Sequence, residues 1–110
     1  MTAPVVAVRS DAGGSTIDVK LSGEIDLANA DDVAQAVDAA ITNHSVDAII
    51  DVAEITYIDS VGMRYLFTLA ARLNTAQIRL RIVAPLGSPA RRVMELSGLN
   101  AVADVDPPLG

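Results

Sequence analysis

The order of its strand and helix patterns is the feature that most constrains how this chain can fold. Two β-rich runs, residues 5–9 and 16–22, come first, and the turn-forming residues 11–14 between them predict an antiparallel hairpin. Helix and strand patterns then alternate. The expected helices begin near Asn29, Ser60 and Pro89, and the expected strands span residues 46–52, 78–83 and 101–105. Strands separated by helices pair in parallel, so the sequence predicts an α/β fold with a mixed, mostly parallel sheet and three or four helices.

Local signals indicate where several of these elements lie and end. Asn29 is expected to cap the first helix, while Ser88 and Gly98 are expected to cap the two ends of the third. The run 46–52 is almost continuously apolar, which is typical of a central strand covered on both faces. The alternation in residues 78–83 predicts a strand with one solvated face, near an edge of the sheet.

Composition limits the classes of function. The 110 residues suffice for one domain, whose core we expect between about residues 5 and 105, with a loose tail at 106–110. A net charge of −6 disfavours contact with nucleic acid. The sequence has no basic leader and no long apolar run, so we expect a soluble, cytoplasmic protein that does not enter a membrane. The lack of cysteine excludes disulfides, thiol nucleophiles and thiolate metal sites.

No arrangement of residues predicts catalysis. The single histidine, His44, stands in a polar connection after the first helix. Asp47 and Asp51 lie four residues apart in one expected strand, too far along it to act as a pair. There is neither a glycine-rich loop followed by lysine nor a set of metal ligands at known spacing. The sequence therefore predicts a binding protein that is not an enzyme and needs no cofactor or metal.

Two loops expected at the carboxyl ends of neighbouring strands form the candidate site. Partners and ligands of parallel sheets bind where the strand-to-helix loops gather, at the carboxyl ends of the strands. The loops expected there are residues 23–29 and 53–60. They include Gly23-Glu24-Ile25-Asp26 and, running into the second helix, Asp59-Ser60-Val61-Gly62.

These segments resemble the STAS family of bacterial anti-sigma-factor antagonists. Residues 21–26 resemble the family's first signature, 50–63 its strand, loop and phosphoacceptor segment, and 97–99 the end of its third helix. The resemblance extends over about residues 15–105. It implies a protein that occupies an anti-sigma factor kinase, which then releases its sigma factor, so that transcription changes indirectly. It further implies that the kinase phosphorylates Ser60 to end the contact and that a phosphatase restores it.

The resemblance also implies a partner-binding surface around this serine. Its expected members are Glu24, Asp26, Asp59, Ser60, Val61 and Gly62. Val61 departs from the family's pattern, because relatives often carry a second hydroxyl residue there. Arg64 also departs from it, in a stretch that is commonly more apolar. Arg64 lies four residues after Ser60 and either reaches a phosphate there or is a solvated charge; we favour the solvated charge.

Structural roles compete with functional ones at these positions. A serine that caps a helix stabilises it by about 1 kcal/mol, which would explain Ser60 without phosphorylation. Asp59 either orients the Ser60 hydroxyl, contacts the partner or bonds nearby backbone N–H groups. Asp26 and Glu24 either belong to the docking surface or make local bonds. Gly62 predicts a close approach of backbone or partner, since glycine in a helix costs up to about 1 kcal/mol against alanine.

Three hypotheses for the function follow. The leading one is an anti-sigma factor antagonist that phosphorylation of Ser60 inactivates. The alternative is a constitutive STAS scaffold subunit of a larger assembly such as a lipid-transport ATPase complex, in which Ser60 only caps a helix. A small-molecule sensor that binds nucleotide at the same loops is a remote third, because no phosphate cradle supports it.

Overall fold

A five-stranded sheet and three α-helices make up the part of the chain that the computed structural model describes, residues 4–11 and 13–108. The elements are β1 (Val5–Ser10), β2 (Thr16–Ile25), α1 (Ala30–Ala40), β3 (Asp47–Ile58), α2 (Ser60–Thr75), β4 (Arg79–Val83), α3 (Pro89–Ser97), a 3₁₀ turn (Leu99–Ala101) and β5 (Asp104–Asp106). The strands lie side by side in chain order. β1 is antiparallel to β2 and each later pair is parallel, which confirms the predicted α/β fold and its mixed sheet.

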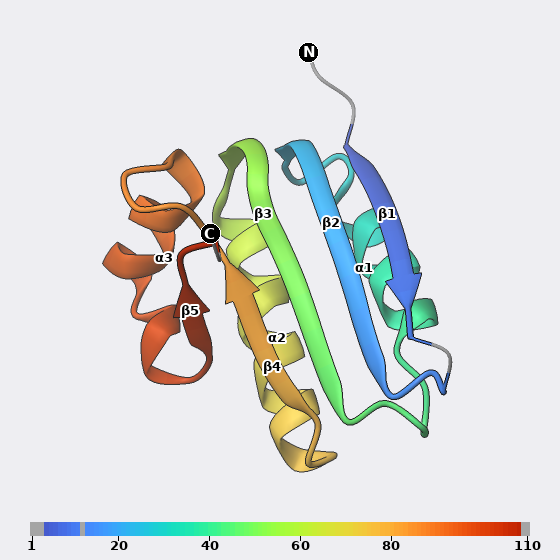
Figure 1. Ribbon diagram of the computed structural model, residues 1–110. Coiled ribbons are helices and arrows are strands. Elements are labelled where there is room, and N and C mark those ends of the chain that lie inside the picture. The colour runs from blue at the N-terminus through green and yellow to red at the C-terminus, as the bar shows by residue number, and fades with distance from the viewer. Residues whose placement is uncertain (1–3, 12, 109–110) are drawn as a thin grey trace.

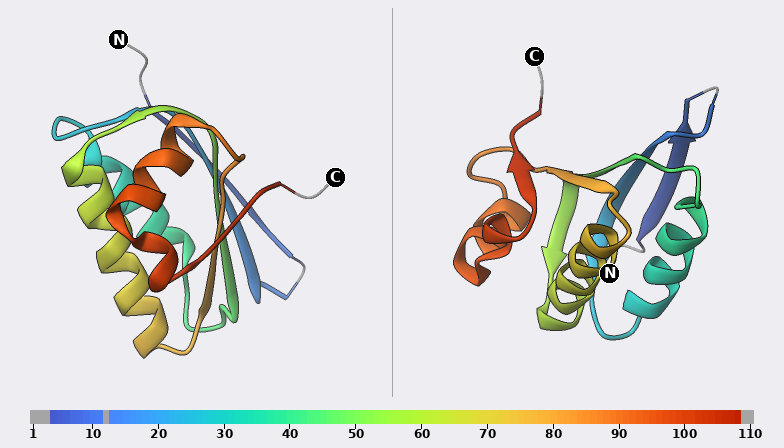
Figure 2. Two further views of the ribbon diagram at one scale, coloured as in Figure 1. Left: turned by 90° about the vertical axis from the view of Figure 1, so that its left-hand side faces the viewer. Right: turned by 90° about the horizontal axis from the view of Figure 1, so that it is seen from below.

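All three α-helices cover the same face of the sheet, as the edge-on view in Figure 2 shows. In Figure 1 they lie behind the strands, with α1 and α3 toward opposite edges. β3 is the central strand, as predicted, but the expectation that both of its faces are covered is wrong. Ile50 and Val52 are fully buried, whereas Ile49 and Asp51 on the other face stay partly exposed. Because the strand order never reverses, each crossover adds its helix to the same side of the sheet.

The core between the sheet and the helices is aliphatic. Aromatic residues make up only 3% of the chain, so Val, Ile, Leu, Ala and Met fill this space. Its largest fully buried side chains include Leu21, Ile50, Leu69, Ile82 and Met94. In the described part of the chain, no helix is long and apolar enough to span a bilayer.

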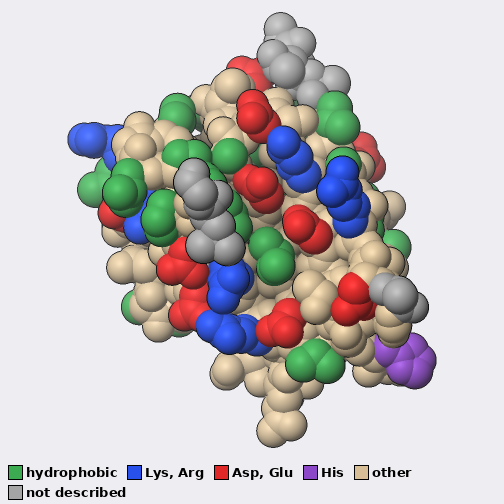
Figure 3. Space-filling view, viewed as in Figure 1, with side chains coloured by type: hydrophobic (Ala, Val, Ile, Leu, Met, Phe, Trp, Pro, Cys, Tyr) green, Lys and Arg blue, Asp and Glu red, His purple; other side chains and the backbone are tan. Residues whose placement is uncertain are grey.

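The uncovered face of the sheet carries charges of both signs, which lie intermingled over the strands in Figure 3. Arg79 Nε lies 3.6 Å from Asp104 Oδ2, and Arg81 Nε lies 3.5 Å from Asp106 Oδ2, so β4 and β5 are joined by two ion pairs. Exposed pairs of this kind stabilise by at most about 1 kcal/mol each. β4 thus has the solvated face that its alternation predicts, and it lies near an edge of the sheet, next to the edge strand β5.

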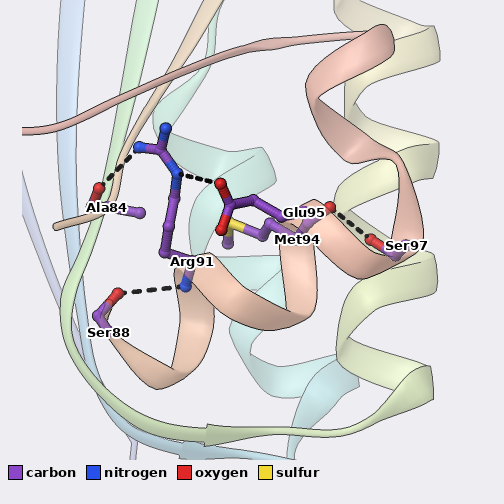
Figure 4. A network of polar contacts seen from close by, with 6 residues as sticks. All are labelled: Ala84, Ser88, Arg91, Met94, Glu95 and Ser97. Carbon is purple, nitrogen blue, oxygen red and sulfur yellow. Dashed lines mark hydrogen bonds and ion pairs between the residues drawn. The ribbon is translucent and has the colours of Figure 1, made fainter. Parts of the chain in front are cut away.

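A polar network fastens α3 to the end of β4 (Figure 4). Ser88 Oγ accepts a hydrogen bond from the Arg91 N–H at 3.2 Å, and Gly98 has a φ of +84°, so both predicted caps are confirmed. The Arg91 guanidinium donates to the carbonyl of Ala84, just after β4, at 3.0 Å, and its Nε lies 3.7 Å from Glu95 Oε2. Arg91 therefore positions α3 against the sheet.

The C-terminal strand differs from its predicted limits. Residues 99–101 form the 3₁₀ turn, so β5 begins only at Asp104. It includes Asp106, which was expected in the tail. Residues 109 and 110 of that tail, residue 12 of the hairpin turn and residues 1–3 lie outside the described residues.

Replacing Ile50 with alanine tests the one-sided core. Ile50 is fully buried, so the change leaves a cavity, and we expect the free energy of unfolding to fall by about 2–5 kcal/mol. Ile49→Ala, the matched change on the open face, is expected to cost about 1 kcal/mol or less. Chemical denaturation measures both values, and equal losses would contradict a sheet covered on one face.

Candidate functional site

The carboxyl ends of β2 and β3 meet at one end of the sheet. Their pairing continues to Ile25 opposite Ile58, and the Asp59 N–H then donates to the Ile25 carbonyl at 3.1 Å. Both strands are thus longer than predicted, and residues 23–25 and 53–58 of the expected loops are strand. Gly23 has a φ of +90° beside a register shift of this pair, a conformation that glycine adopts without strain. The pairing brings residues 24–26 beside residues 59–62, as the sequence predicted.

The carboxylate of Asp59 joins the two segments. Its Oδ1 accepts hydrogen bonds from the N–H groups of Val61 at 2.9 Å and Gly62 at 3.0 Å. Its Oδ2 accepts from the N–H of Leu27 at 3.0 Å, 32 residues away in the chain. One side chain therefore caps α2 and holds the β2–α1 connection against it.

Ser60 is not the helix cap, so that structural interpretation is wrong. Asp59 has the extended backbone of an N-cap residue, with φ −96° and ψ −175°, and its side chain accepts the N–H groups of the first turn. Ser60 is already the first residue of α2, where a side chain no longer folds back onto those groups. It is exposed, and its hydroxyl has no hydrogen-bond partner among the described residues. The Ser60 hydroxyl is therefore free at the positive end of the helix dipole.

Side chains of its own sequence hold the β2–α1 connection in one shape. Asn29 occupies the N-cap position of α1 but makes no cap bond. Its Oδ1 instead accepts from the Asp26 N–H at 3.0 Å, and its Nδ2 donates to the Glu24 carbonyl at 2.9 Å. Asp26 Oδ1 accepts from the Ala28 N–H at 3.0 Å, so Asp26 makes the local bond that was the alternative to a place in the docking surface. The polar side chains of this connection turn back onto its backbone.

Gly62 lies where the first turn of α2 packs directly on the ends of β2 and β3. A Cβ at this position would come within 2.8 Å of Ile58 Cγ1 and 3.0 Å of Ile25 Cγ2. The close approach is therefore made by core side chains, and not by backbone or a partner as the sequence predicted. Gly62 is buried, so it supports the surface from beneath.

The other residues singled out from the sequence lie at different places. Of the expected partner-binding set, Ser60 is exposed, and those that stay partly exposed are Glu24, Asp26, Asp59 and Val61. Arg64 is exposed and forms no ion pair with any described residue. His44 is exposed after α1. Among the residues described, no cluster of His, Cys, Asp and Glu side chains could hold a metal ion.

Leu27 belongs to this surface, although nothing in the sequence singled it out. It exposes 76% of its surface, and its N–H is bonded to the residue that precedes Ser60. A leucine in a loop carries no chemical signal in a sequence. Its place directly after Asp26 in a loop of the expected site was the only available sign.

A family model and solved structures match this chain over nearly its whole length. The model of the STAS domain family matches residues 5–109. The chain belongs to the STAS domain family. A STAS domain described as an anti-sigma factor antagonist from Mycobacterium paratuberculosis is similar to it at 27% identity and a TM-score of 0.86, over 97% of this chain and 88% of that one.

More distant structures share the STAS fold. The anti-sigma factor antagonist SpoIIAA in its unphosphorylated form is 19% identical, with a TM-score of 0.73 over 92% of this chain and 87% of that one. The Bacillus cell fate determinant SpoIIAA in its phosphorylated form is also 19% identical, with a TM-score of 0.68 over 92% of this chain and 90% of that one. A search of the curated proteins finds no significant match.

Alanine substitutions at Asp59 and Ser60 test which of them caps α2. Asp59→Ala removes the cap and the bond to Leu27, so we expect the free energy of unfolding to fall by about 1–3 kcal/mol. Ser60→Ala is expected to change it by less than about 0.5 kcal/mol. Denaturation measures both, and faster hydrogen exchange at the Leu27 amide reports the lost bond in Asp59→Ala. A larger loss in Ser60→Ala than in Asp59→Ala would identify Ser60 as the cap.

Proposed function

We propose that this STAS domain is an anti-sigma factor antagonist. In its unphosphorylated form it binds an anti-sigma factor kinase through the end of the sheet around Ser60, and the kinase then releases its sigma factor. Phosphorylation of Ser60 ends the contact, and a phosphatase that acts on phospho-Ser60 restores it. The domain acts in the cytoplasm as a binding partner, without enzymatic activity and without direct contact to nucleic acid or membrane.

The free hydroxyl of Ser60 is the observation that carries this proposal. A phosphoacceptor has to reach the active site of a kinase. Ser60 is exposed on the first turn of α2, and its hydroxyl makes no hydrogen bond to a described residue that would have to break first. The likeness to anti-sigma factor antagonists supports the proposal. One of these relatives, SpoIIAA, is described in both an unphosphorylated and a phosphorylated form.

The role of Asp59 weighs against the constitutive scaffold alternative. That alternative accounts for Ser60 as a helix cap, but Asp59 makes the cap bonds to Val61 and Gly62. Ser60 is thereby left without a structural role, whereas phosphorylation requires such a free hydroxyl.

A charge on Ser60 should act on binding far more than on folding. In the free protein, a negative charge at a helix N-terminus gains about 0.3–1 kcal/mol, and repulsion from Asp59 at a hydrated surface offsets a similar amount. At a docked interface the same charge loses its water beside the carboxylate of Asp59, which already bonds three N–H groups. An unpaired buried charge costs several kcal/mol, so the loss of binding free energy exceeds the change in the free energy of folding.

The site of phosphorylation is the first test. With ATP and the cognate anti-sigma factor kinase, we expect one phosphate per chain, on Ser60, because neighbouring Val61 offers no second hydroxyl. Peptide mapping by mass spectrometry locates it, and Ser60→Ala should stay unmodified. A phosphate on Ser22, Thr56 or Ser88, with Ser60 untouched, would refute the assignment.

Ser60→Glu tests the switch itself. We expect it to weaken binding of the purified kinase at least about a hundredfold, while the free energy of unfolding changes by about 0.5 kcal/mol or less. A binding titration and thermal melting measure the two effects. Ser60→Ala should still bind, and Ser60→Gln, which adds bulk without charge, should lose less affinity than Ser60→Glu. Tight binding by Ser60→Glu, or its unfolding, would show that charge at this site does not control the contact.

A further inference from the structure

Leu27 is an exposed apolar side chain on a fixed backbone. It lies in the connection between β2 and α1 and exposes 76% of its surface. Its N–H donates to Asp59 Oδ2 at 3.0 Å, which ties it to the residue directly before Ser60. The side chain therefore starts from a defined position beside the candidate phosphoacceptor.

The rest of the connection has no backbone donor left for a partner. The N–H groups of Asp26 and Ala28 donate to side chains of the same loop, each at 3.0 Å. The N–H of Asn29 donates to the Asp26 carbonyl at 3.1 Å. Together with the bond from Leu27, all four N–H groups of residues 26–29 are satisfied inside the protein. The neighbouring exposed side chains are Leu27 and Ala28, so this loop offers a partner an apolar contact.

Exposure alone would not distinguish Leu27, since single apolar side chains are common on protein surfaces. Leu96 exposes 78% of its surface on the last turn of α3, and no other observation connects it with a site. Leu27 is about as exposed as Leu96, but it lies in a loop whose backbone is already held by hydrogen bonds before a partner binds. Tyr57, 52% exposed and paired with Glu24 at the end of β3, adds apolar surface at the same end of the sheet. Because the backbone of this loop is already held by hydrogen bonds, burying the Leu27 side chain at an interface costs little further ordering of the chain.

We propose that Leu27 is the apolar anchor that the kinase buries when it binds the Ser60 surface. Asp59 is the positioning residue that holds Leu27 in place for this contact. Because this assignment concerns the contact with the same kinase, it rests on the proposed function. Affinity then comes largely from Leu27, while the charge on Ser60 decides whether the contact forms.

Binding titrations of the full chain with the purified kinase, without ATP, test the anchor. Leu27→Ala should weaken binding roughly tenfold to a hundredfold, because it removes most of a buried aliphatic side chain. Leu27→Met keeps the apolar volume and should stay within about threefold of the unmodified chain. Leu96→Ala, the control of matched exposure, should bind as the unmodified chain does. With ATP, Leu27→Ala should raise the KM for phosphorylation of Ser60 and leave kcat unchanged.

A double-mutant cycle tests the positioning role of Asp59. In Asp59→Asn the remaining Oδ1 can still accept the N–H groups of Val61 and Gly62, but the amide nitrogen cannot accept from Leu27. We expect Leu27→Ala to cost less affinity in the Asp59→Asn background than in the unmodified chain. Strictly additive losses would contradict the positioning role.

The outcomes separate this inference from the proposed function. If the unmodified chain binds the kinase and is phosphorylated, but Leu27→Ala binds as tightly as Leu96→Ala, the anchor is refuted and the proposed function stands. If the unmodified chain neither binds the kinase nor accepts phosphate, the proposed function fails and the anchor fails with it.

Discussion

The parallel pairing of β2 with β3 is the interaction on which the rest of this structure depends. It runs from Thr16 opposite Asp47 to Ile25 opposite Ile58, and its buried face is the surface on which the helices pack. Because the pairing continues through two register shifts to the last residues of both strands, the segments that follow them lie together. The Asp59 N–H donates to the Ile25 carbonyl and so extends the pairing by one hydrogen bond. The Asp59 carboxylate then accepts from the N–H of Leu27, in the segment that follows β2. The candidate site thus directly follows the paired ends of β2 and β3, and hydrogen bonds of Asp59 hold its segments together.

Asp59 makes the hydrogen bonds that stabilise the site, whereas the proposed switch is its neighbour Ser60. The residue that caps α2 and holds Leu27 is not the residue that we propose to be modified. A phosphate on Ser60 would therefore break no hydrogen bond of the folded chain. Its charge would act where water is excluded, at the interface with the kinase, because an unpaired charge costs most there. A serine that served as the cap could not be modified so freely.

The one-sided packing divides the surface into regions of different character. The open face of the sheet is charged with both signs, and no described helix covers it. Two ion pairs between β4 and β5 lie on that face. The carboxyl end of the sheet combines Leu27 and Tyr57 with the free hydroxyl of Ser60. Apolar surface and a free hydroxyl thus occur together at that end of the sheet.

The sequence by itself determined the elements, their order and the segments of the candidate site. Caps such as Ser88 and Gly98 could be predicted because they act within a few residues. The tertiary structure alone decided that β3 is covered on one face, since Ile49 looks like a core residue until the side taken by every crossover helix is known. It also decided that Asp59 and not Ser60 caps α2, and that Leu27 is held beside them. The reason is that these features depend on a strand register and a hydrogen bond between residues 32 positions apart, which local patterns do not encode.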